Sequence, residues 1–448
     1  MTVGQTDAIS ARTSAQKTDV AAWLLLMVLL ALSFVSFLDR QIISLMVNLI
    51  KVDLGISDSQ IGILQGSAFG LVYPLFAVPL GYAADRYSRR WVIFLGVVFW
   101  SIAAVASGLC NSFDTLLAAR IGVGIGEAAL GPASASLISD TFPRHRLALV
   151  FSIFSCGALL GSAGALAIGG AVIAWAGDGL TFPLVGFLKP WQVAFVVTGF
   201  PGALVALLIF LFPEPPRPAR SAAAHAPWSE VFAFIGRNWK FLASNILGFA
   251  CLLLVTWAML AWMPAILERS YGWTIAQIGT SLGLFTAVLG LSGQLTNGAV
   301  VDRMVARGIE DAHMRYYMVG AIIIGVFGAA APFAPTAIIY LGLLAPVKFL
   351  LNFAGVSISS LQLVTPSRLR GRITALMGIV SSVLGGTFGP SVVAFFTDRV
   401  FKDPEMVPYS LGLTIALFMP LAAVLFALGL SPMRHAIAEQ RIASANGV

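Results

Sequence analysis

The sequence predicts an all-α polytopic membrane protein with twelve transmembrane helices in two pseudo-symmetric six-helix bundles. First, 58% of its residues are hydrophobic and only 10% are charged, a composition outside the range of soluble domains. Second, apolar segments of about 20 residues, long enough to cross a ~30 Å hydrocarbon core, can be placed twelve times. Third, two loop motifs recur about half a chain apart, which indicates duplicated halves.

The predicted spans are helices because lipid offers backbone N–H and C=O groups no hydrogen-bond partners. Short loops separate them, as expected for spans that return across the same membrane. In chain order they cover residues 21–49, 59–83, 91–110, 113–139, 147–174, 191–212, 239–267, 275–301, 314–331, 335–363, 373–397 and 407–430.

The basic residues predict which side each loop faces. Nineteen lysines and arginines fall in the termini and in the loops after even-numbered spans. Basic loops stay cytoplasmic, so both termini are expected in the cytoplasm. No basic run with interleaved aromatics predicts a nucleic-acid partner, and the net charge of +7 follows the orientation bias. Only five basic residues fall in the opposite loops: Lys51, Lys189, Arg269, Arg399 and Lys402.

The N-terminal segment and the cysteines give two further expectations. Residues 1–19 lack the pattern of a cleavable signal, so the first span is expected to act as its own insertion signal. Cys110, Cys156 and Cys251 lie far apart with no metal-type spacing, so they predict packing and neither a disulfide nor a metal site. The absence of an Asn-X-Ser/Thr site fits a bacterial inner membrane.

Paired loop motifs divide the chain. The loop Gly81-Tyr-Ala-Ala-Asp-Arg-Tyr-Ser-Arg-Arg90 has a second copy at Gly298-Ala-Val-Val-Asp-Arg303, and the loops beginning at Pro143 and Pro366 form another pair. The expected domains are a first bundle (1–212), a proline-rich linker (213–238), a second bundle (239–430) and a cytoplasmic tail (431–448). Residues 228–237 of the linker predict either an interfacial helix or an ordinary lead-in to the seventh span.

Five charges lie deep inside predicted spans, away from the span ends, where an ionisable group indicates a functional site. At 1.5 Å per residue, Arg120 lies ~10 Å and Glu127 ~20 Å from the outer boundary, and Asp39 lies ~15 Å deep. If the first and fourth spans face each other, these three side chains form a cluster. The cluster is either a permanent salt-bridge network or a proton-coupling site in which protonating a carboxylate frees Arg120 for another partner.

The remaining two intramembrane charges predict substrate contacts. Arg40 lies ~100° around the helix from Asp39, so it either reaches a neighbour or braces Asp39. Lys348 lies ~20 Å deep in the tenth span, with Asn352 one turn away and no carboxylate at that depth in the second half. It suits an anionic ligand group, although snorkelling or a reach to Glu127 stays open. Trp257 is a candidate apolar wall for the substrate or a packing residue.

The paired loops predict a gate on the cytoplasmic side. A carboxylate at a helix end can pair with a neighbouring helix terminus or arginine in one conformation and release it in another. The alternative is a solvated turn charge. The candidate gate residues are Asp85, Arg86, Arg89, Arg90, Asp302 and Arg303.

Glycines at four-residue spacing predict close helix packing. The pairs are Gly122 and Gly126, Gly157 and Gly161, and Gly385 and Gly389. The run Gly122-Val-Gly-Ile-Gly126 is not a dinucleotide-binding loop, because no strand precedes it and it lies within a membrane helix.

The motifs taken together resemble a known family. The Gly81–Arg90 loop resembles the hallmark loop of the major facilitator superfamily, and Arg120-Ile-Gly-Val-Gly-Ile-Gly126 resembles its fourth-helix motif. Phe37-Leu-Asp-Arg-Gln41, Arg120 through Ala128 and Ser136 through Pro143 are similar to the spinster family within it. The resemblance implies that spans 1 and 4 face each other and that the substrates are lysophospholipid- or sphingolipid-like. The second hallmark loop lacks the paired arginines.

The predicted function is a proton-coupled secondary active transporter of such amphiphiles, working by alternating access as a monomer, with no cofactor beyond the proton gradient. A drug/proton antiporter or a small organic-anion transporter is the closest alternative, and a non-transporting membrane lipid sensor is the alternative of another class. An ion channel would need an axial ring of like charges. An enzyme would need a nucleophile and base at depth, and no histidine lies within a predicted span.

Overall fold

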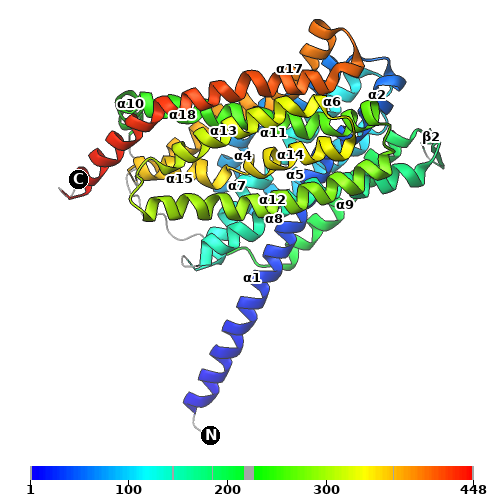
Figure 1. The fold of residues 1–448 in the computed structure, drawn as a ribbon. Coiled ribbons are helices and arrows are strands. Elements are labelled where there is room, and N and C mark those ends of the chain that lie inside the picture. Colours follow the sequence, from blue (N-terminus) through cyan, green and yellow to red (C-terminus); the bar gives the residue numbers. More distant parts are fainter. Residues whose placement is uncertain (1–2, 144–145, 184, 216–226, 367, 446–448) are drawn as a thin grey trace. The chain divides into compact units, whose positions relative to one another are not determined.

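The computed structural model describes residues 3–143, 146–183, 185–215, 227–366 and 368–445. This part of the chain is almost entirely helical (Figure 1). It contains twelve helical segments long and apolar enough to cross a membrane, and each overlaps one predicted span. The predicted all-α polytopic class is therefore confirmed.

The chain forms two compact units. Unit 1 comprises residues 1–42 and 75–220, and unit 2 comprises residues 43–74 and 221–448. The duplicated motifs assign residues 43–74 to the first bundle, whereas by contact they belong with the second. The chain changes unit inside its first span and again inside its second.

The elements of unit 1 are mostly long helices. A short hairpin joins two of them, with Leu180 opposite Leu188 in antiparallel register, and Leu188 packs on Ala176 and Val193. The elements are α1 (Val3–Gln41), α4 (Tyr73–Arg86), α5 (Arg89–Ser107), α6 (Phe113–Glu127), α7 (Leu130–Thr141), α8 (Leu147–Ala176), β1 (Leu180–Phe182), β2 (Gly186–Leu188), α9 (Pro190–Leu207) and η4 (Leu208–Leu211).

Unit 2 contains the end of the first span, the start of the second and spans 7 to 12. Its elements are η1 (Ile42–Met46), α2 (Val47–Leu54), α3 (Asp58–Ser67), η2 (Ala68–Val72), α10 (Trp228–Arg237), α11 (Trp239–Tyr271), α12 (Ile275–Ala306), α13 (Ala312–Ala330), η5 (Ala331–Phe333), α14 (Ala337–Leu350), α15 (Ala354–Val364), α16 (Arg370–Ser382), η6 (Val383–Thr387), α17 (Phe388–Phe395), η7 (Phe396–Phe401), η8 (Pro404–Met406) and α18 (Val407–Ala445).

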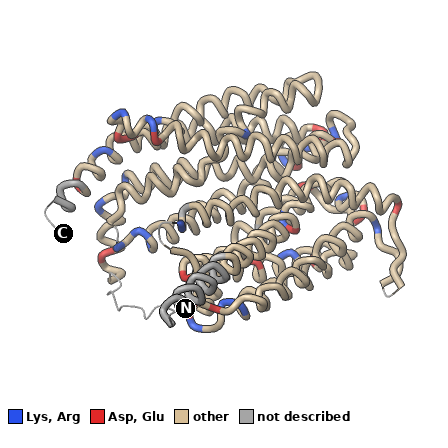
Figure 2. Tube along the Cα trace, turned by 90° about the horizontal axis from the view of Figure 1, so that it is seen from below, with Lys and Arg blue, Asp and Glu red and all other residues tan. Residues whose placement is uncertain are grey.

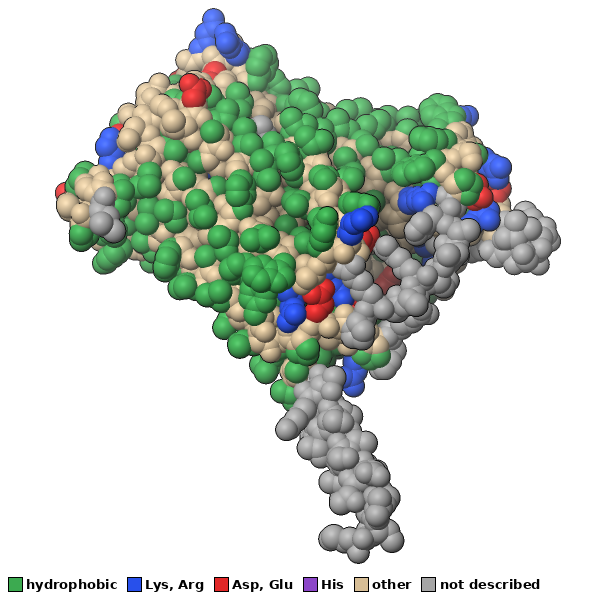
Figure 3. Space-filling model, turned by 180° about the vertical axis from the view of Figure 1, so that it is seen from behind, with side chains coloured by type: hydrophobic (Ala, Val, Ile, Leu, Met, Phe, Trp, Pro, Cys, Tyr) green, Lys and Arg blue, Asp and Glu red, His purple; other side chains and the backbone are tan. Residues whose placement is uncertain are grey.

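The distribution of side chains matches a lipid environment. Charged residues gather near the ends of helices, with few along their middles (Figure 2). Large apolar side chains such as Leu75, Leu95 and Ile102 are exposed, and hydrophobic side chains cover most of the face seen in Figure 3. An exposed apolar surface of this extent is expected where lipid, and not water, is the solvent.

Three spans are interrupted close to an intramembrane charge. Span 1 changes to 3-10 geometry at Ile42, directly after Asp39 and Arg40. Span 4 is interrupted between α6, which ends at Glu127, and α7. Span 10 is interrupted between α14, whose last turn carries Lys348, and α15. Irregular backbone at membrane depth is tolerated where it is buried in protein or lines a cavity.

The predicted glycine contacts are confirmed. A Cβ added to Gly161 on α8 would lie 2.3 Å from the Phe34 carbonyl oxygen on α1, and one added to Gly157 would lie 2.7 Å from the Leu30 carbonyl oxygen. Similar clashes occur at Gly126 and Gly389. The backbones approach so closely that only hydrogen fits at these positions.

The first hallmark loop organises one end of unit 1. Arg89 is 1% exposed. Its backbone N–H and its Nε donate to Glu214 Oε1 at 2.8 and 3.1 Å, and its guanidinium also bonds Asp140. The Ser88 hydroxyl donates to the other oxygen of Glu214. Two of these partners, Asp140 and Glu214, lie at the end of α7 and after η4, so the network ties three helix ends of the same unit together.

Substitution of Gly161 by alanine should destabilise the protein by about 1–3 kcal/mol, because the added methyl group meets backbone atoms that cannot move aside. Thermal unfolding of the detergent-solubilised protein measures the change. Gly378→Ala on α16 is the matched control, since a Cβ there meets nothing within 4 Å. An equal loss in both variants would contradict the proposed backbone contact.

The Glu214 network should make stability depend on pH. Burial acts to raise the pKa of Glu214, but hydrogen bonds from Ser88 and Arg89 outweigh it, so the pKa is lowered. A lowered carboxylate pKa stabilises the folded state above the unfolded value of ~4.3, and this contribution is lost as the pH falls through the folded pKa. Glu214→Gln should therefore unfold at lower temperature than wild type at pH 7, and the difference should shrink as the pH falls below the unfolded value of ~4.3. Asp178→Asn, at an exposed carboxylate, should show no such dependence.

Candidate functional site

The four charged residues of the first half lie on two neighbouring elements of unit 1. Asp39 and Arg40 occupy the last turn of α1, and Arg120 and Glu127 lie two turns apart on one face of α6. Asp39, Arg120 and Glu127 are each at most 1% exposed. The structure thus brings together the three residues that their depths in the sequence placed in one cluster.

The pairing within this cluster involves Arg40. Its Nη2 lies 2.5 Å and its Nε 3.2 Å from Glu127 Oε2. Arg40 also lies over the Phe37 ring, with its Cζ 4.8 Å from the centroid. Of the two readings for Arg40, the structure shows the reach toward a neighbour, and that neighbour is Glu127.

Arg120 contacts the backbone of the first span. Its Nη1 donates to the Asp39 carbonyl oxygen at 3.1 Å and its Nη2 to the Arg40 carbonyl oxygen at 3.4 Å. These carbonyls lie where α1 gives way to 3-10 geometry. The guanidinium therefore satisfies backbone groups that the break releases from regular helical bonding.

The Asp39 carboxylate is buried without a hydrogen bond. Both of its oxygens lack a partner among the described residues, as does the indole N–H of Trp100. The neighbours of the carboxylate are the charged groups of Glu127 and Arg120 and the polar side chains of Thr198 and Trp100, none of them within hydrogen-bond geometry. A buried, unbonded carboxylate is costly when ionised and much less so when protonated, so this group can bind a proton with little rearrangement around it.

The tenth span is interrupted in the second half at residues 351–353. Asn297 of α12 is fully buried and donates from Nδ2 to the carbonyl oxygens of Phe349 and Asn352 at 3.0 and 3.1 Å. Tyr317 Oη donates to the Asn352 carbonyl oxygen at 3.3 Å. The Asn352 side chain donates to the Lys348 carbonyl oxygen at 2.8 Å. The predicted binding residue Asn352 therefore caps the end of α14.

Lys348 stands apart from this hydrogen-bonded group. It is half-buried, and no ion pair or hydrogen bond to its side chain occurs within the described residues of the chain. Its position in the last turn of α14 is favourable, because the helix C-terminus carries partial negative charge. An anionic ligand group could supply a full counter-charge at the same place.

Trp257 on α11 packs against the glycines of span 11. It is half-buried. A Cβ added to Gly386 would lie 3.6 Å from Trp257 Nε1, and one added to Gly389 would lie 3.0 Å from Trp257 Cβ. This contact accounts for the residue by packing, one of the two readings left open.

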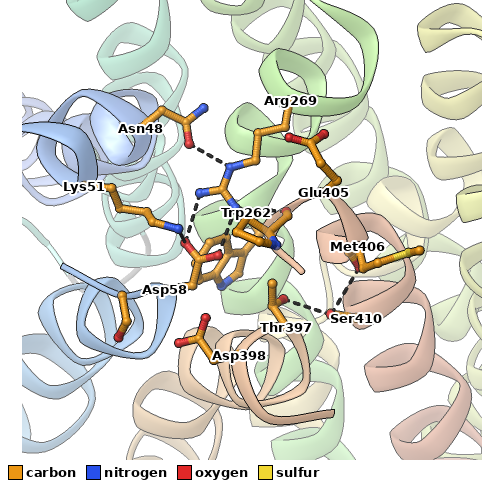
Figure 4. Close-up of polar contacts among 12 residues, drawn as sticks. Asn48, Lys51, Asp58, Trp262, Arg269, Thr397, Asp398, Glu405, Met406 and Ser410 are labelled. Atoms are coloured by element: carbon orange, nitrogen blue, oxygen red, sulfur yellow. Dashed lines mark hydrogen bonds and ion pairs between the residues drawn. The ribbon is translucent and has the colours of Figure 1, made fainter. Parts of the chain in front are cut away.

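The polar cluster in Figure 4 joins the first two spans to the seventh within unit 2. Asp58 at the start of α3 is fully buried. Arg269 near the end of α11 binds both oxygens of Asp58, with N–O distances of 2.9 Å, and Lys51 Nζ lies 2.6 Å from Oδ1. Arg269 Nε also donates to Asn48 Oδ1 at 2.7 Å. We call Asn48, Lys51, Asp58 and Arg269 the Asp58 latch.

A backbone contact continues from the Asp58 latch along the second span. Gly62, Gly66 and Gly70 recur at four-residue spacing on α3 and η2. A Cβ added to Gly62 would lie 3.1 Å from Ala394 Cβ. One added to Gly66 would lie 2.6 Å from the Thr387 carbonyl oxygen, and one added to Gly70 would lie 2.1 Å from the Thr387 nitrogen. Asp398 also accepts a hydrogen bond from the Ser59 N–H at 2.7 Å.

The candidate gate residues fall into two groups. Asp85 and Arg86 at the end of α4, and Asp302 and Arg303 near the end of α12, are exposed on their own units. Arg89 and Arg90 instead bond within unit 1, the latter through Nη1 to the Phe212 carbonyl oxygen at 2.6 Å. The gate itself stays a prediction.

Sequence reasoning missed several residues. The Asp58 latch had a usable signal, because Lys51 and Arg269 are two of only five basic residues on the sparsely charged side. The stripe Gly62, Gly66 and Gly70 could have been found by its spacing. Asn297 gave no pattern, since a single buried amide is recognised only once its partners are known.

Comparison with known proteins identifies the family. Residues 29–390 match the Major Facilitator Superfamily. The chain is 28% identical over 380 residues to a probable L-galactonate transporter of Escherichia coli (strain K12), covering 81% of this chain and 80% of that protein. It is 28% identical over 408 residues to protein spinster homolog 1 of Xenopus tropicalis, covering 84% of this chain and 73% of that protein.

Solved structures share the fold. A bacterial homologue of the human lysosomal transporter Spinster, in an inward-facing and unoccupied conformation, superposes with a TM-score of 0.75 at 23% identity, covering 93% of this chain and 97% of that one. A D-xylose–proton symporter gives a TM-score of 0.66 at 18% identity, covering 89% and 96%. The chain belongs to the major facilitator superfamily and is a transporter similar to the spinster proteins.

Proposed function

We propose that this transporter couples the proton gradient to the movement of lysophospholipid- or sphingolipid-like amphiphiles by alternating access. The observation that carries the proposal is the fully buried Asp39 carboxylate, which has no hydrogen bond among the described residues, beside the Arg40–Glu127 ion pair. We propose that both termini lie in the cytoplasm, as the basic residues favour. We further propose a monomer in a bacterial inner membrane.

In the proposed coupling step, a proton reaches Asp39 or Glu127. Protonating Glu127 removes the charge that holds Arg40, so the guanidinium becomes available to an anionic substrate group. Arg120 stays bonded to the backbone beside Asp39, so it can transmit a change on α6 to the break in the first span. The proton is thus converted into a rearrangement of a helix junction.

Alternating access also requires the spans to separate on the side opposite the termini. The Asp58 latch and the glycine stripe hold the ends of spans 1 and 2 against spans 7 and 11. We propose that the latch opens when the site faces outward, and that Asp85, Arg86, Asp302 and Arg303 pair on the cytoplasmic side in that state. Rocking of this kind moves packed elements as rigid bodies about a central site.

The substrate class rests on the charges and on similarity. Arg40 in unit 1 and Lys348 in unit 2 each offer positive charge for a phosphate or carboxylate. The lipid-like character of the substrate rests on the resemblance of the motifs to the spinster family. A small organic anion is the second candidate, because one relative is a probable L-galactonate transporter. Both candidates need the same cations, and they differ in whether a long apolar chain is required.

Glu127→Gln and Asp39→Asn should each abolish substrate-stimulated proton flux in proteoliposomes, because neither variant can carry the proton at that position. Lysophospholipid, a phosphorylated sphingolipid, L-galactonate and a cationic dye serve as substrates. We expect flux with the lysophospholipid or the phosphorylated sphingolipid, and none with L-galactonate or the dye. Asp114→Asn, at an exposed carboxylate in the first turn of α6, should retain wild-type flux.

Three outcomes would contradict this prediction. Full coupling in both carboxylate variants would show that the buried cluster is structural. Flux with L-galactonate but not with lysophospholipid would favour the organic-anion transporter. Binding of lysophospholipid without flux would instead indicate a lipid sensor.

Asp58→Asn should shift the protein toward the conformation that is open on the side of the latch. Removing one partner of a buried ion pair costs about 3–5 kcal/mol, enough to reverse a two-state equilibrium. Spin labels can be attached at Val52 and Val400, which are both exposed. Double electron–electron resonance should then report a longer distance between the two labels in Asp58→Asn than in the wild type. Arg399→Gln, which removes an exposed charge at the same end, should leave the distance unchanged. Equal distances in Asp58→Asn and wild type would refute a gating role.

A further inference from the structure

A polar cavity of about 430 Å³ lies where α10 meets α11 and the C-terminal part of α18 passes beside them. Figure 1 shows α10 next to this part of α18. Its charged and aromatic lining comes from Arg237, Trp239 and Lys240 on one side and from His435 and Glu439 on the other. None of these residues belongs to the central charge cluster or the Asp58 latch.

The charge of the cavity suits a monoanion. Arg237, Lys240 and Glu439 are exposed, and none has an ion pair within the described residues. The Lys240 ammonium lies 6.0 Å from the Trp239 ring centroid. With His435 neutral, two cations and one carboxylate leave one net positive charge, which matches a phosphodiester better than a phosphate dianion.

The aromatic residues place the cavity at the level of lipid headgroups. Trp239 is exposed at the first residue of span 7, and Trp228 and Phe232 are exposed on α10. Tryptophans at span ends lie at the membrane–water interface, and an amphipathic helix with such a face lies in the interfacial plane. Glu230 and Trp228 anchor α10 through an ion pair to Arg368 and a cation–π contact to Arg372.

A separate apolar groove of about 370 Å³ lies two helical turns from the cavity along α11 and α18. It is lined by Leu247 and Leu254 of α11 and by Leu421 and Leu425 of α18, together with residues of η6 and α17. Leu247 lies seven residues beyond Lys240, and Leu425 lies seven residues before Pro432, which lines the cavity. Seven residues are two helical turns, so Leu247 and Leu425 lie on the same helix faces as Lys240 and Pro432.

We propose that the cavity and the groove together bind one molecule of an anionic glycerophospholipid of the phosphatidylglycerol type. The phosphodiester lies between Arg237 and Lys240, Glu439 accepts a hydrogen bond from a glycerol hydroxyl, and one acyl chain fills the groove. A soluble anion would use the cavity alone and leave the groove empty. The proposal concerns a lipid held from the membrane and is independent of which substrate the central site carries.

Native mass spectrometry of the full chain in detergent, titrated with phosphatidylglycerol or phosphatidylcholine, tests the proposal. The wild type should bind phosphatidylglycerol in preference to phosphatidylcholine. Arg237→Gln/Lys240→Gln should weaken phosphatidylglycerol binding about 30-fold, at roughly fivefold for each interfacial cation. Arg399→Gln/Lys402→Gln, which removes one exposed arginine and one exposed lysine at the other end of unit 2, should bind as the wild type does.

A second variant tests the groove separately from the charges. Leu421→Trp should fill the groove and weaken phosphatidylglycerol binding while all the cations remain. Unchanged binding in the double glutamine variant, an equal loss in the control pair, or displacement of the lipid by excess inorganic phosphate would each overturn the proposal. Wild-type helical circular dichroism and monodisperse elution of every variant establish that a loss of binding is not a loss of folding.

Discussion

The cost of placing charge in hydrocarbon is the constraint on which the rest of this structure depends. An unpaired charge and an unbonded backbone carbonyl both cost free energy in lipid. In this protein the intramembrane charges lie next to the helix interruptions that leave carbonyl groups unbonded. Asp39, Arg40, Glu127 and Lys348 each lie within a few residues of a helix interruption. At the first of these, Arg120 bonds the carbonyl oxygens of Asp39 and Arg40. A charge that would otherwise only destabilise the bundle therefore supports the irregular backbone that a moving helix needs.

The two ends of the molecule use ion pairs in different ways. At the hallmark loop, Arg89 at the start of α5 bonds partners at two other helix ends of unit 1, so the network makes that end rigid. At the Asp58 latch, Arg269 and Lys51 connect elements that the duplicated motifs assign to different halves. The net stabilisation from a buried ion pair is small, because desolvation offsets most of the attraction. Such a pair can open into water at little net cost, whereas a contact made only of packed apolar groups could not.

Features of the fold and the site that depend on local sequence could be predicted, whereas features that depend on contacts between distant segments could not. Hydropathy gave all twelve spans, and depth along two helices brought Asp39, Arg120 and Glu127 into one cluster. The partner of Glu127 could not be obtained this way. An arginine side chain reaches far enough to override an angular offset of ~100° on the helix, and the 3-10 turn after Gln41 changes the direction of the chain. Asn297 and Asp58 depend on how distant helices pack, which no local pattern encodes.

The charge count of the buried cluster in unit 1 bears on the direction of coupling. Asp39 and Glu127 balance Arg40 and Arg120 when both carboxylates are ionised. Protonating either carboxylate leaves one net positive charge, so on the proposed mechanism a proton and an anionic substrate strengthen each other's binding. Linkage is reciprocal, so an anionic headgroup would favour movement of proton and substrate in the same direction. A cationic drug would compete with the proton and favour exchange. The sign of the substrate charge therefore separates the lipid and organic-anion transporters from the drug antiporter on electrostatic grounds alone.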